Sequence, residues 1–158
     1  MVGMEYVGFY GNQLTGTIPN LTNMENLLWL AIDQNMLTGT LKTELGLFGK
    51  LTKISIHENM LTGTLPSELG LLEKLKEVTA GFNDLSGTIP QELGHLLARN
   101  ETLKIFNISG GNSGFFGFLP EELCALQTDV DGVLSFDCTD QLGGCSCNCS
   151  DAMNATFV

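Results

Sequence analysis

Positive charge is scarce in this sequence. Lysine and arginine together number 7 in 158 residues, against 18 aspartates and glutamates, and the net charge is −11. Nucleic-acid binding needs clustered lysine and arginine to neutralise phosphates, so the composition argues against it. The same deficit disfavours an anionic membrane surface. No apolar run approaches the length of a membrane span, so we expect membrane attachment only through a segment missing from this chain.

Recognisable catalytic motifs are also lacking. The sequence contains no HExxH motif and no glycine loop of the kind that cradles phosphates. We expect the chain to assemble no Ser/His/Asp arrangement. His57 and His95 lie in separate segments, which argues against a shared metal site. The sequence therefore predicts a protein that is not an enzyme and has neither a cofactor nor a metal.

What the sequence does contain is an internal repeat. The segment NMLTGTLPSELG, which begins at Asn59, has close copies that begin at Asn12, Asn35 and Asn83, at a spacing of 23 or 24 residues. Self-similarity at such a period is typical of stacked-repeat proteins, in which each repeat packs only on its neighbours. No signal peptide precedes the first repeat, so we interpret the chain as a fragment that begins inside the repeat array.

Apolar residues precede each asparagine at fixed offsets, as Leu51, Ile54 and Ile56 do before Asn59. The full pattern, LxxLxxLxLxxNxLTGxIPxxLGxL, resembles the leucine-rich repeats of the plant-type subclass over residues 1–123. The resemblance implies an α/β repeat fold, which is a curved right-handed solenoid. It places a parallel sheet on the concave side and short helical turns on the convex side.

The asparagines Asn12, Asn35, Asn59 and Asn83 have an expected structural role. Each coil leaves backbone N–H and C=O groups inside the solenoid, and these groups must be paired. A side-chain amide both donates and accepts, so stacked asparagines can form a ladder between coils.

The fifth repeat departs from the pattern. Leu103 follows Leu96 by seven positions instead of three, which indicates an insertion of about four residues around 97–100. We expect this insertion to bulge from the convex side. A second insertion, of one residue, falls near Ser109–Asn112.

After residue 123 the pattern fades into a predicted cap, residues 124–150, followed by a tail, residues 151–158. Val133, Leu134 and Phe136 are expected to form a last strand. The cap resembles the cysteine-rich C-terminal caps of diatom and algal leucine-rich repeat proteins. Disulfides are favoured over zinc because the CxCxC spacing is tighter than usual zinc sites. The candidates, whose pairing the sequence leaves open, are Cys124, Cys138, Cys145, Cys147 and Cys149.

Five glycosylation sequons accompany the cysteines. Together they predict an extracellular or cell-surface location. We expect Asn107 to be poorly placed for glycosylation because it falls in a strand. The candidate asparagines are Asn20, Asn100, Asn107, Asn148 and Asn154.

The residues between the inward apolar positions of each strand vary from repeat to repeat, while the framework does not. Framework positions recur because their task recurs, so the variable positions are free to be specific. We predict that they bind a protein, peptide or glycan ligand on the concave face, with large aromatic rings as anchors. An alternative is that they are merely tolerated at the surface. The predicted binding residues are Tyr6, Tyr10, Trp29, Asp33, Lys53, His57, Glu77 and Phe82.

Two alternative functions remain open. The threonine pairs of the LTGT segments would share one face if those segments are extended, at about 4.8 Å between coils. A flat Thr-x-Thr array resembles the ice-binding face of insect antifreeze solenoids. The second alternative is that the chain is part of the ectodomain of a receptor-like membrane protein. The sequence identifies neither the ligand nor the oligomeric state.

Overall fold

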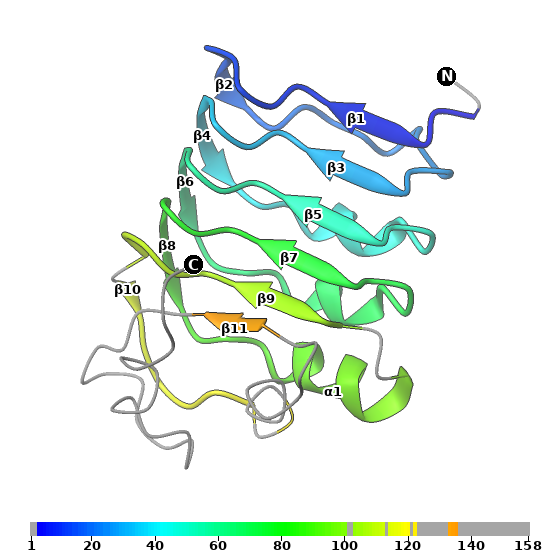
Figure 1. Ribbon diagram of the computed structural model, residues 1–158, viewed down its shortest axis with the longest axis vertical. Helices are drawn as coiled ribbons and strands as arrows, with labels where there is room; N and C mark the ends of the chain where they lie inside the picture. The colour runs from blue at the N-terminus through cyan, green and yellow to red at the C-terminus, as the bar shows by residue number, and fades with distance from the viewer. Residues whose placement is uncertain (1–2, 101–102, 113, 121, 123–132, 136–158) are drawn as a thin grey trace.

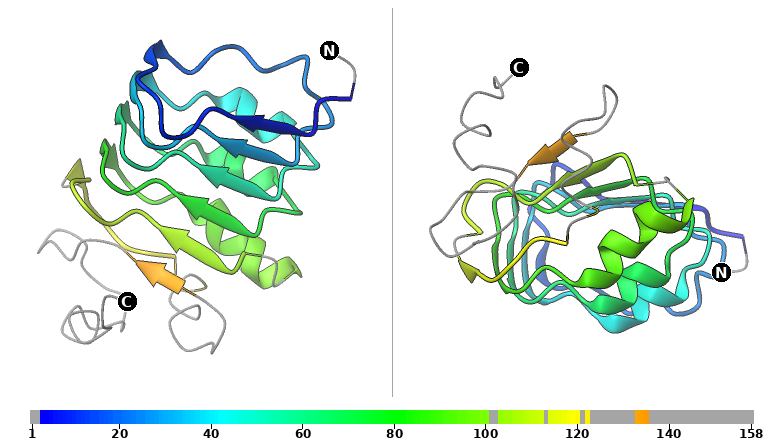
Figure 2. Two further views of the ribbon diagram at one scale, coloured as in Figure 1. Left: turned by 45° about the horizontal axis from the view of Figure 1, so that its top comes forward. Right: turned by 90° about the horizontal axis from the view of Figure 1, so that it is seen from below.

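In a computed structural model, the chain is a solenoid in which each repeat forms one coil (Figure 1). The structure describes residues 3–100, 103–112, 114–120, 122 and 133–135. Each full coil contributes one strand to each of two parallel sheets, and Figure 2 shows the sheets on different sides of a common core. The predicted fold class is confirmed.

Six strands form the first sheet, in sequence order. Its register aligns equivalent repeat positions, since Tyr6 pairs with Trp29, Trp29 with Lys53, and Lys53 with Glu77. The middle residue of each of the first five strands points inward, and we call the outward side of this sheet the strand face. The strands are β1 (Tyr6–Gly8), β3 (Trp29–Ala31), β5 (Lys53–Ser55), β7 (Glu77–Thr79), β9 (Ile105–Asn107) and β11 (Val133–Ser135).

The LTGT segments form a second sheet of five strands. Its outward side presents the threonine pairs, and we call it the threonine face. The sequence predicted extended segments here only as a condition of the ice-binding alternative. The strands are β2 (Thr15–Thr17), β4 (Met36–Thr40), β6 (Met60–Gly63), β8 (Asp84–Gly87) and β10 (Gly114–Phe115).

Short helices close the coils on the convex side (Figure 2). The regular repeats form the 3₁₀ turns η1 (Thr43–Leu47) and η2 (Ser67–Leu71). The fifth repeat forms an α-helix of 10 residues instead, α1 (Gln91–Asn100). The insertion predicted around residues 97–100 lies at the end of this helix. The extra residues therefore lengthen a helical turn and leave the strand register intact.

The core is a continuous apolar column between the sheets and the helices. Each coil adds residues from the same offsets, and full burial of one such side chain stabilises the fold by about 1.5–3 kcal/mol. The column includes the fully buried residues Leu27, Leu30, Leu51, Ile54, Leu75, Val78, Leu103 and Phe106.

Asparagine side chains join successive coils beside this column. Asn59 Nδ2 donates to the backbone oxygens of Ile32 in the preceding coil (3.0 Å) and Ile56 in its own coil (3.2 Å). Its Oδ1 accepts from Leu37 N at 3.0 Å. Asn35 and Asn83 bond in the same way.

Two other asparagines occupy the equivalent position in the end coils of the ladder. Asn112 makes equivalent contacts in the fifth coil, although it was not among the predicted ladder residues. Its place was hidden by the insertion before it. Asn12 is exposed in the first coil, and its Nδ2 donates to the oxygens of Phe9 and Tyr10.

Several predictions lie wholly or mainly outside the described residues. The tail and the cap do so, except for β11, which matches the predicted last strand. Among the described sequons, Asn20 is exposed, and Asn107 lies in β9 with its Oδ1 accepting from the backbone and hydroxyl of Ser109. The cysteines and the remaining sequon asparagines whose side chains are not described are Cys124, Cys138, Cys145, Cys147, Cys149, Asn100, Asn148 and Asn154.

Candidate ligand-binding face

The first column of the strand face is a row of side chains in mutual contact. The rings of Tyr6 and Trp29 meet edge to face, with centroids 5.3 Å apart and planes at 77°. Lys53 Nζ lies 5.9 Å from the Trp29 ring centroid and 2.8 Å from Glu77 Oε1. These four residues occupy the same position of successive repeats, so the register of the sheet places them side by side on adjacent strands.

These contacts orient the two rings without covering them. An aromatic pair contributes about 0.5–1.5 kcal/mol beyond area burial, and an exposed cation–π contact about 0.5–1 kcal/mol. Even so, 47% of Trp29 and 56% of Tyr6 remain exposed. The Tyr6 and Trp29 rings therefore form an ordered apolar platform that is open to solvent.

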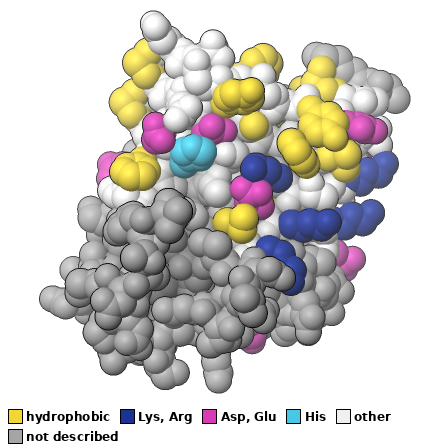
Figure 3. All heavy atoms as spheres, viewed as in Figure 1, with side chains coloured by type: hydrophobic (Ala, Val, Ile, Leu, Met, Phe, Trp, Pro, Cys, Tyr) yellow, Lys and Arg dark blue, Asp and Glu magenta, His cyan; other side chains and the backbone are white. Residues whose placement is uncertain are grey.

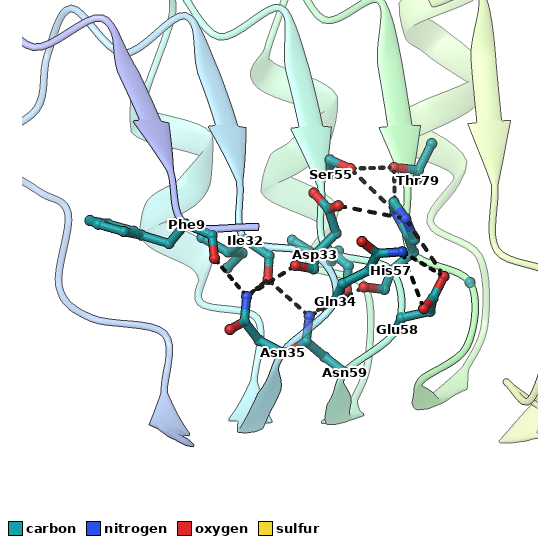
Figure 4. A network of polar contacts seen from close by, with 12 residues as sticks. Phe9, Ile32, Asp33, Gln34, Asn35, Ser55, His57, Glu58, Asn59 and Thr79 are labelled. Atoms are coloured by element: carbon teal, nitrogen blue, oxygen red, sulfur yellow. Dashed lines mark hydrogen bonds and ion pairs between the residues drawn. The ribbon is translucent and has the colours of Figure 1, made fainter. Parts of the chain in front are cut away.

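A polar network lies at the other end of the same strands (Figure 4). Thr79 Oγ1 donates to Ser55 Oγ at 3.0 Å, and His57 Nδ1 lies 3.2 Å from Ser55 Oγ. On the other side of the ring, His57 Nε2 lies 3.7 Å from Asp33 Oδ2 and 4.0 Å from Glu58 Oε1. Side chains from three coils thus hold one imidazole in place.

This network contradicts one expectation from the sequence. Ser55, His57 and Asp33 do come together, because residues at i and i+2 of a strand share a face and the next coil adds the third group. However, Ser55 and Asp33 are themselves buried. Acyl transfer also needs free backbone donors near the nucleophile, whereas β5 is paired on both sides. The contacts with Ser55 and Asp33 therefore fix the orientation of the His57 ring on the strand face and do not form a nucleophilic site.

The residue before each ladder asparagine adopts a left-handed backbone conformation. Its φ is 55° at Gln34, 53° at Glu58 and 54° at Phe82. Such a conformation costs a residue with a Cβ about 1–2 kcal/mol, and glycine avoids this cost, as Gly11 does in the first coil. Three coils therefore retain a side chain where glycine is easier to accommodate.

All three of these turn residues contact a neighbouring coil. Gln34 Nε2 donates to the Glu58 carboxylate at 3.4 Å. The Phe82 ring lies over Gly110, where an added Cβ would come within 2.7 Å of it, and 62% of Phe82 is exposed. The one-residue insertion near Gly110 thus provides a glycine beneath the ring.

Six of the eight predicted binding residues fall into two groups. Tyr6, Trp29, Lys53 and Glu77 form the first column, and Asp33 and His57 belong to the polar network. Tyr10 is exposed before the turn of its coil, and Phe82 occupies the turn of another. We expected the variable positions to face the concave surface, but Asp33, Ser55 and Gly81 are buried. At Gly81 an added Cβ would collide with the Ser109 carbonyl oxygen.

Several network residues were absent from the predicted set, namely Ser55, Thr79 and Glu58. The signal that finds them is present in the sequence. Ser55 and Thr79 lie two residues after a first-column residue, on the same face of their strands, and Glu58 follows His57 directly. Among the described residues, no group of three His, Cys, Asp or Glu side chains is placed to hold a metal ion.

The threonine face follows a different geometry. Its register is shifted by two residues from the repeat, so that Thr40 pairs with Thr62 and Thr38 with Met60. Thr38 and Thr62 donate their hydroxyls to Gly16 O (3.2 Å) and Gly39 O (3.4 Å) of the preceding coil. The second threonine of each pair places its methyl group over the glycine of the next coil.

The comparisons with known proteins agree with this fold. A family model described as Leucine Rich Repeat matches residues 50–72. No curated protein sequence matches the chain significantly. The repeat, the two-sheet coil and this match define a solenoid of leucine-rich repeats. The chain belongs to the leucine-rich repeat family in its plant-type form.

Three solved structures illustrate the similarity. The structure of PEPR1–AtPEP1 has 27% identity and a TM-score of 0.70, over 78% of this chain and 17% of that chain. The plant peptide hormone receptor RGFR1 in complex with RGF2 has 31% identity and a TM-score of 0.66, over 81% and 19%. A plant ice-binding protein has 25% identity and a TM-score of 0.65, over 77% and 38%. The chain therefore spans less than half of each of these three proteins.

Among the described residues, no helix is long and apolar enough to cross a membrane.

Proposed function

We propose that this chain is a non-enzymatic extracellular module that binds a peptide or a segment of a protein on its strand face. The main supporting observation is that the exposed Tyr6–Trp29 platform and the ordered His57 network lie on one sheet. Both are oriented by contacts within the protein. Binding therefore loses little side-chain entropy on this face.

The similar structures support a peptide ligand over a glycan. PEPR1 and RGFR1 are each described in complex with another molecule, and RGFR1 is named a peptide hormone receptor. The strand face also offers a peptide both an apolar anchor and polar partners. The same binding face is compatible with the alternative hypothesis of a receptor-like protein. In that hypothesis a membrane span lies in a segment outside this sequence. The sequence of the full-length transcript distinguishes it from a secreted protein.

The test is a screen of secreted peptides and cell-surface glycans against the immobilised chain. The captured ligand is then measured on a variant carrying Trp29→Ala and Tyr10→Ala. We expect a loss of at least about 2 kcal/mol, or roughly 30-fold in Kd, because truncated aromatic anchors have effects of this size. Phe118→Ala is the matched control, since Phe118 is an exposed aromatic outside the strand face. Equal binding by both variants would refute the proposal, and capture of glycans alone would replace the peptide with a glycan.

Ice binding is a second candidate, and two observations favour it. The threonine pairs stack on one face, and the solenoid resembles that of a plant ice-binding protein. Within the described residues, Thr40 and Thr64 make no side-chain hydrogen bond, unlike Thr38 and Thr62. Thermal hysteresis measures this activity. We expect Thr40→Tyr with Thr64→Tyr to abolish it if the face binds ice, while Trp29→Ala leaves it unchanged. Hysteresis that survives the double substitution would eliminate this candidate.

A further inference from the structure

Most of the few cations of this chain gather along one edge of the strand face. Lysine and arginine number 7 in the whole sequence. Five of them lie at the starts of β5, β7 and β9 or just before them, and we call this group the lysine rim. Figure 3 shows lysine side chains on one side of the face and the histidine with acidic neighbours on the other. The rim consists of Lys50, Lys53, Lys74, Lys76 and Lys104.

The rim follows the stacking of the coils. Lys104 N donates to Lys76 O at 2.7 Å, so these two residues are neighbours on adjacent strands. Lys76 N in turn donates to Thr52 O, next to Lys53 in the preceding coil, at 2.8 Å. Adjacent strands are about 4.8 Å apart, so the rim presents a line of cations with a short, regular step.

Only some of the rim lysines have side-chain polar contacts within the described residues. Lys53 pairs with Glu77 at 2.8 Å, and Lys50 Nζ donates to Asn26 Oδ1 at 2.5 Å. Lys74, Lys76 and Lys104 are exposed and have no ion pair within the part of the chain that the structure describes. Like charges on neighbouring strands destabilise a sheet, and this chain has 18 carboxylates with which to relieve them.

We propose that the lysine rim binds an acidic polysaccharide, whose carboxylate or sulfate groups pair with the lysines of successive coils. Lysine is a point charge on a flexible stem, so it accepts either anion. At physiological salt the screening length is about 8 Å, so the local rim decides this contact although the whole molecule is acidic. This site adjoins the proposed peptide site and shares Lys53 with its first column, but it does not depend on peptide binding.

The form of the rim favours a thin polysaccharide over other polyanions. Leu51, Leu75 and Leu103, which adjoin the rim lysines in sequence, are buried and offer no apolar anchor of the kind that peptide recognition uses. The exposed ring beside the rim is Trp29, next to Lys53 at one end of the lysines. Glu73 and Glu77 adjoin the lysines on β7 and just before it. A broad duplex or a membrane surface would press its phosphates against these carboxylates, whereas a single polysaccharide chain can follow the lysines alone.

Three dextrans of equal length provide the test: carboxymethyl dextran, dextran sulfate and neutral dextran. Titration calorimetry of the full chain at low ionic strength is expected to show binding to one or both charged forms and none to the neutral form. The carboxymethyl and sulfate arms identify the anion. We expect Lys76→Gln with Lys104→Gln to weaken binding about tenfold, since exposed ion pairs contribute modestly, and to reduce its salt dependence.

Lys42→Gln is the matched control, because Lys42 is an exposed lysine just before η1, away from the rim. It should bind like the unmodified chain, as should the variant with Trp29→Ala and Tyr10→Ala, whose failure would concern the peptide site alone. An unchanged thermal unfolding midpoint checks that each variant folds. The proposal is overturned if no charged dextran binds, if neutral dextran binds equally, or if Lys42→Gln matches the rim variant. Equally tight binding of duplex DNA also overturns it.

Discussion

The two sheets of this solenoid are built from the same repeat, yet they present different surfaces. On the strand face, in-line register puts Tyr6, Trp29 and Lys53 side by side, and no two of these residues are alike. On the threonine face, a two-residue shift packs threonine methyl groups onto glycines of the next coil. Close packing between coils constrains the second face, whereas the first is free to vary.

This difference explains where a ligand site can arise. A side chain on the strand face has to satisfy only its neighbours in one column, so a mixture of aromatic, acidic and basic groups is tolerated. On the threonine face, a larger group at Gly63 or Gly87 would collide with Thr40 or Thr64. The repeat therefore fixes one face and leaves the other available for recognition.

The ladder that joins both faces should show the largest effect. Asn59→Ala removes the acceptor of the Leu37 N–H and leaves the buried oxygens of Ile32 and Ile56 with one amide donor each, from Asn35 and Asn83. One buried group left unpaired costs about 1–3 kcal/mol and each lost hydrogen bond about 0.5–1.5 kcal/mol, so we expect a loss of about 2–6 kcal/mol in the free energy of unfolding. Denaturant unfolding measures it. Asn12→Ala, at an exposed position, is expected to cost less than about 1 kcal/mol, and equal losses would contradict the ladder.

Packing on the threonine face is tested at its glycines. Gly63→Ala adds a Cβ 2.8 Å from Thr40 Cγ2, at a φ of 78°. Gly16→Ala requires a similar φ, 84°, but its Cβ meets nothing within 4 Å. We expect Gly63→Ala to lose about 1–3 kcal/mol more than Gly16→Ala, because overpacking adds to the backbone strain. Thr40→Ser, which removes the methyl group, should recover most of the difference in a double-mutant cycle.

At the left-handed turns beside the strand face, a substitution by glycine should raise the free energy of unfolding. Gln34→Gly relieves a left-handed residue, and we expect a gain of up to about 1 kcal/mol in the free energy of unfolding. Gly11→Ala, at the equivalent turn, should lose about 1 kcal/mol. Thermal or denaturant unfolding of both variants is the measurement. A loss for Gln34→Gly would mean that its contact with Glu58 outweighs the strain.

A similarly small effect on stability is expected in the His57 network. Thr79→Val removes the hydroxyl that donates to Ser55 and keeps the shape of the side chain. We expect a loss of about 0.5–1.5 kcal/mol in stability, the net contribution of one hydrogen bond. His57 is expected to become more mobile, which side-chain relaxation in NMR can detect. Unchanged stability and unchanged mobility would show that the network does not order the ring.

Much of the strand face could be predicted from the sequence, because a repeat of 23 or 24 residues places equivalent positions in one column. Trp29 beside Lys53 follows from that step alone. The shift of the second sheet does not, since it depends on the tilt of the backbone between coils. The left-handed turn had a sequence signal in Gly11, but Gln34, Glu58 and Phe82 obscured it.

Two other features required the structure. The contacts of His57 with Ser55 and Asp33 depend on the alternation of one strand combined with the step to the coil before it. The lysine rim was concealed by the net charge of −11, which averages over the whole chain. Overall composition reports how many charges there are, and only the coil shows where they gather.

Hydroxyl-radical footprinting of the chain with its captured peptide tests the central claim most directly. The account predicts that bound peptide lowers the oxidation of Trp29 and Tyr10 on the strand face. Oxidation of the exposed rings Phe116 and Phe118, outside that face, should not change. Protection of Phe116 and Phe118 with Trp29 and Tyr10 unaffected would contradict it, because the ligand would then bind elsewhere.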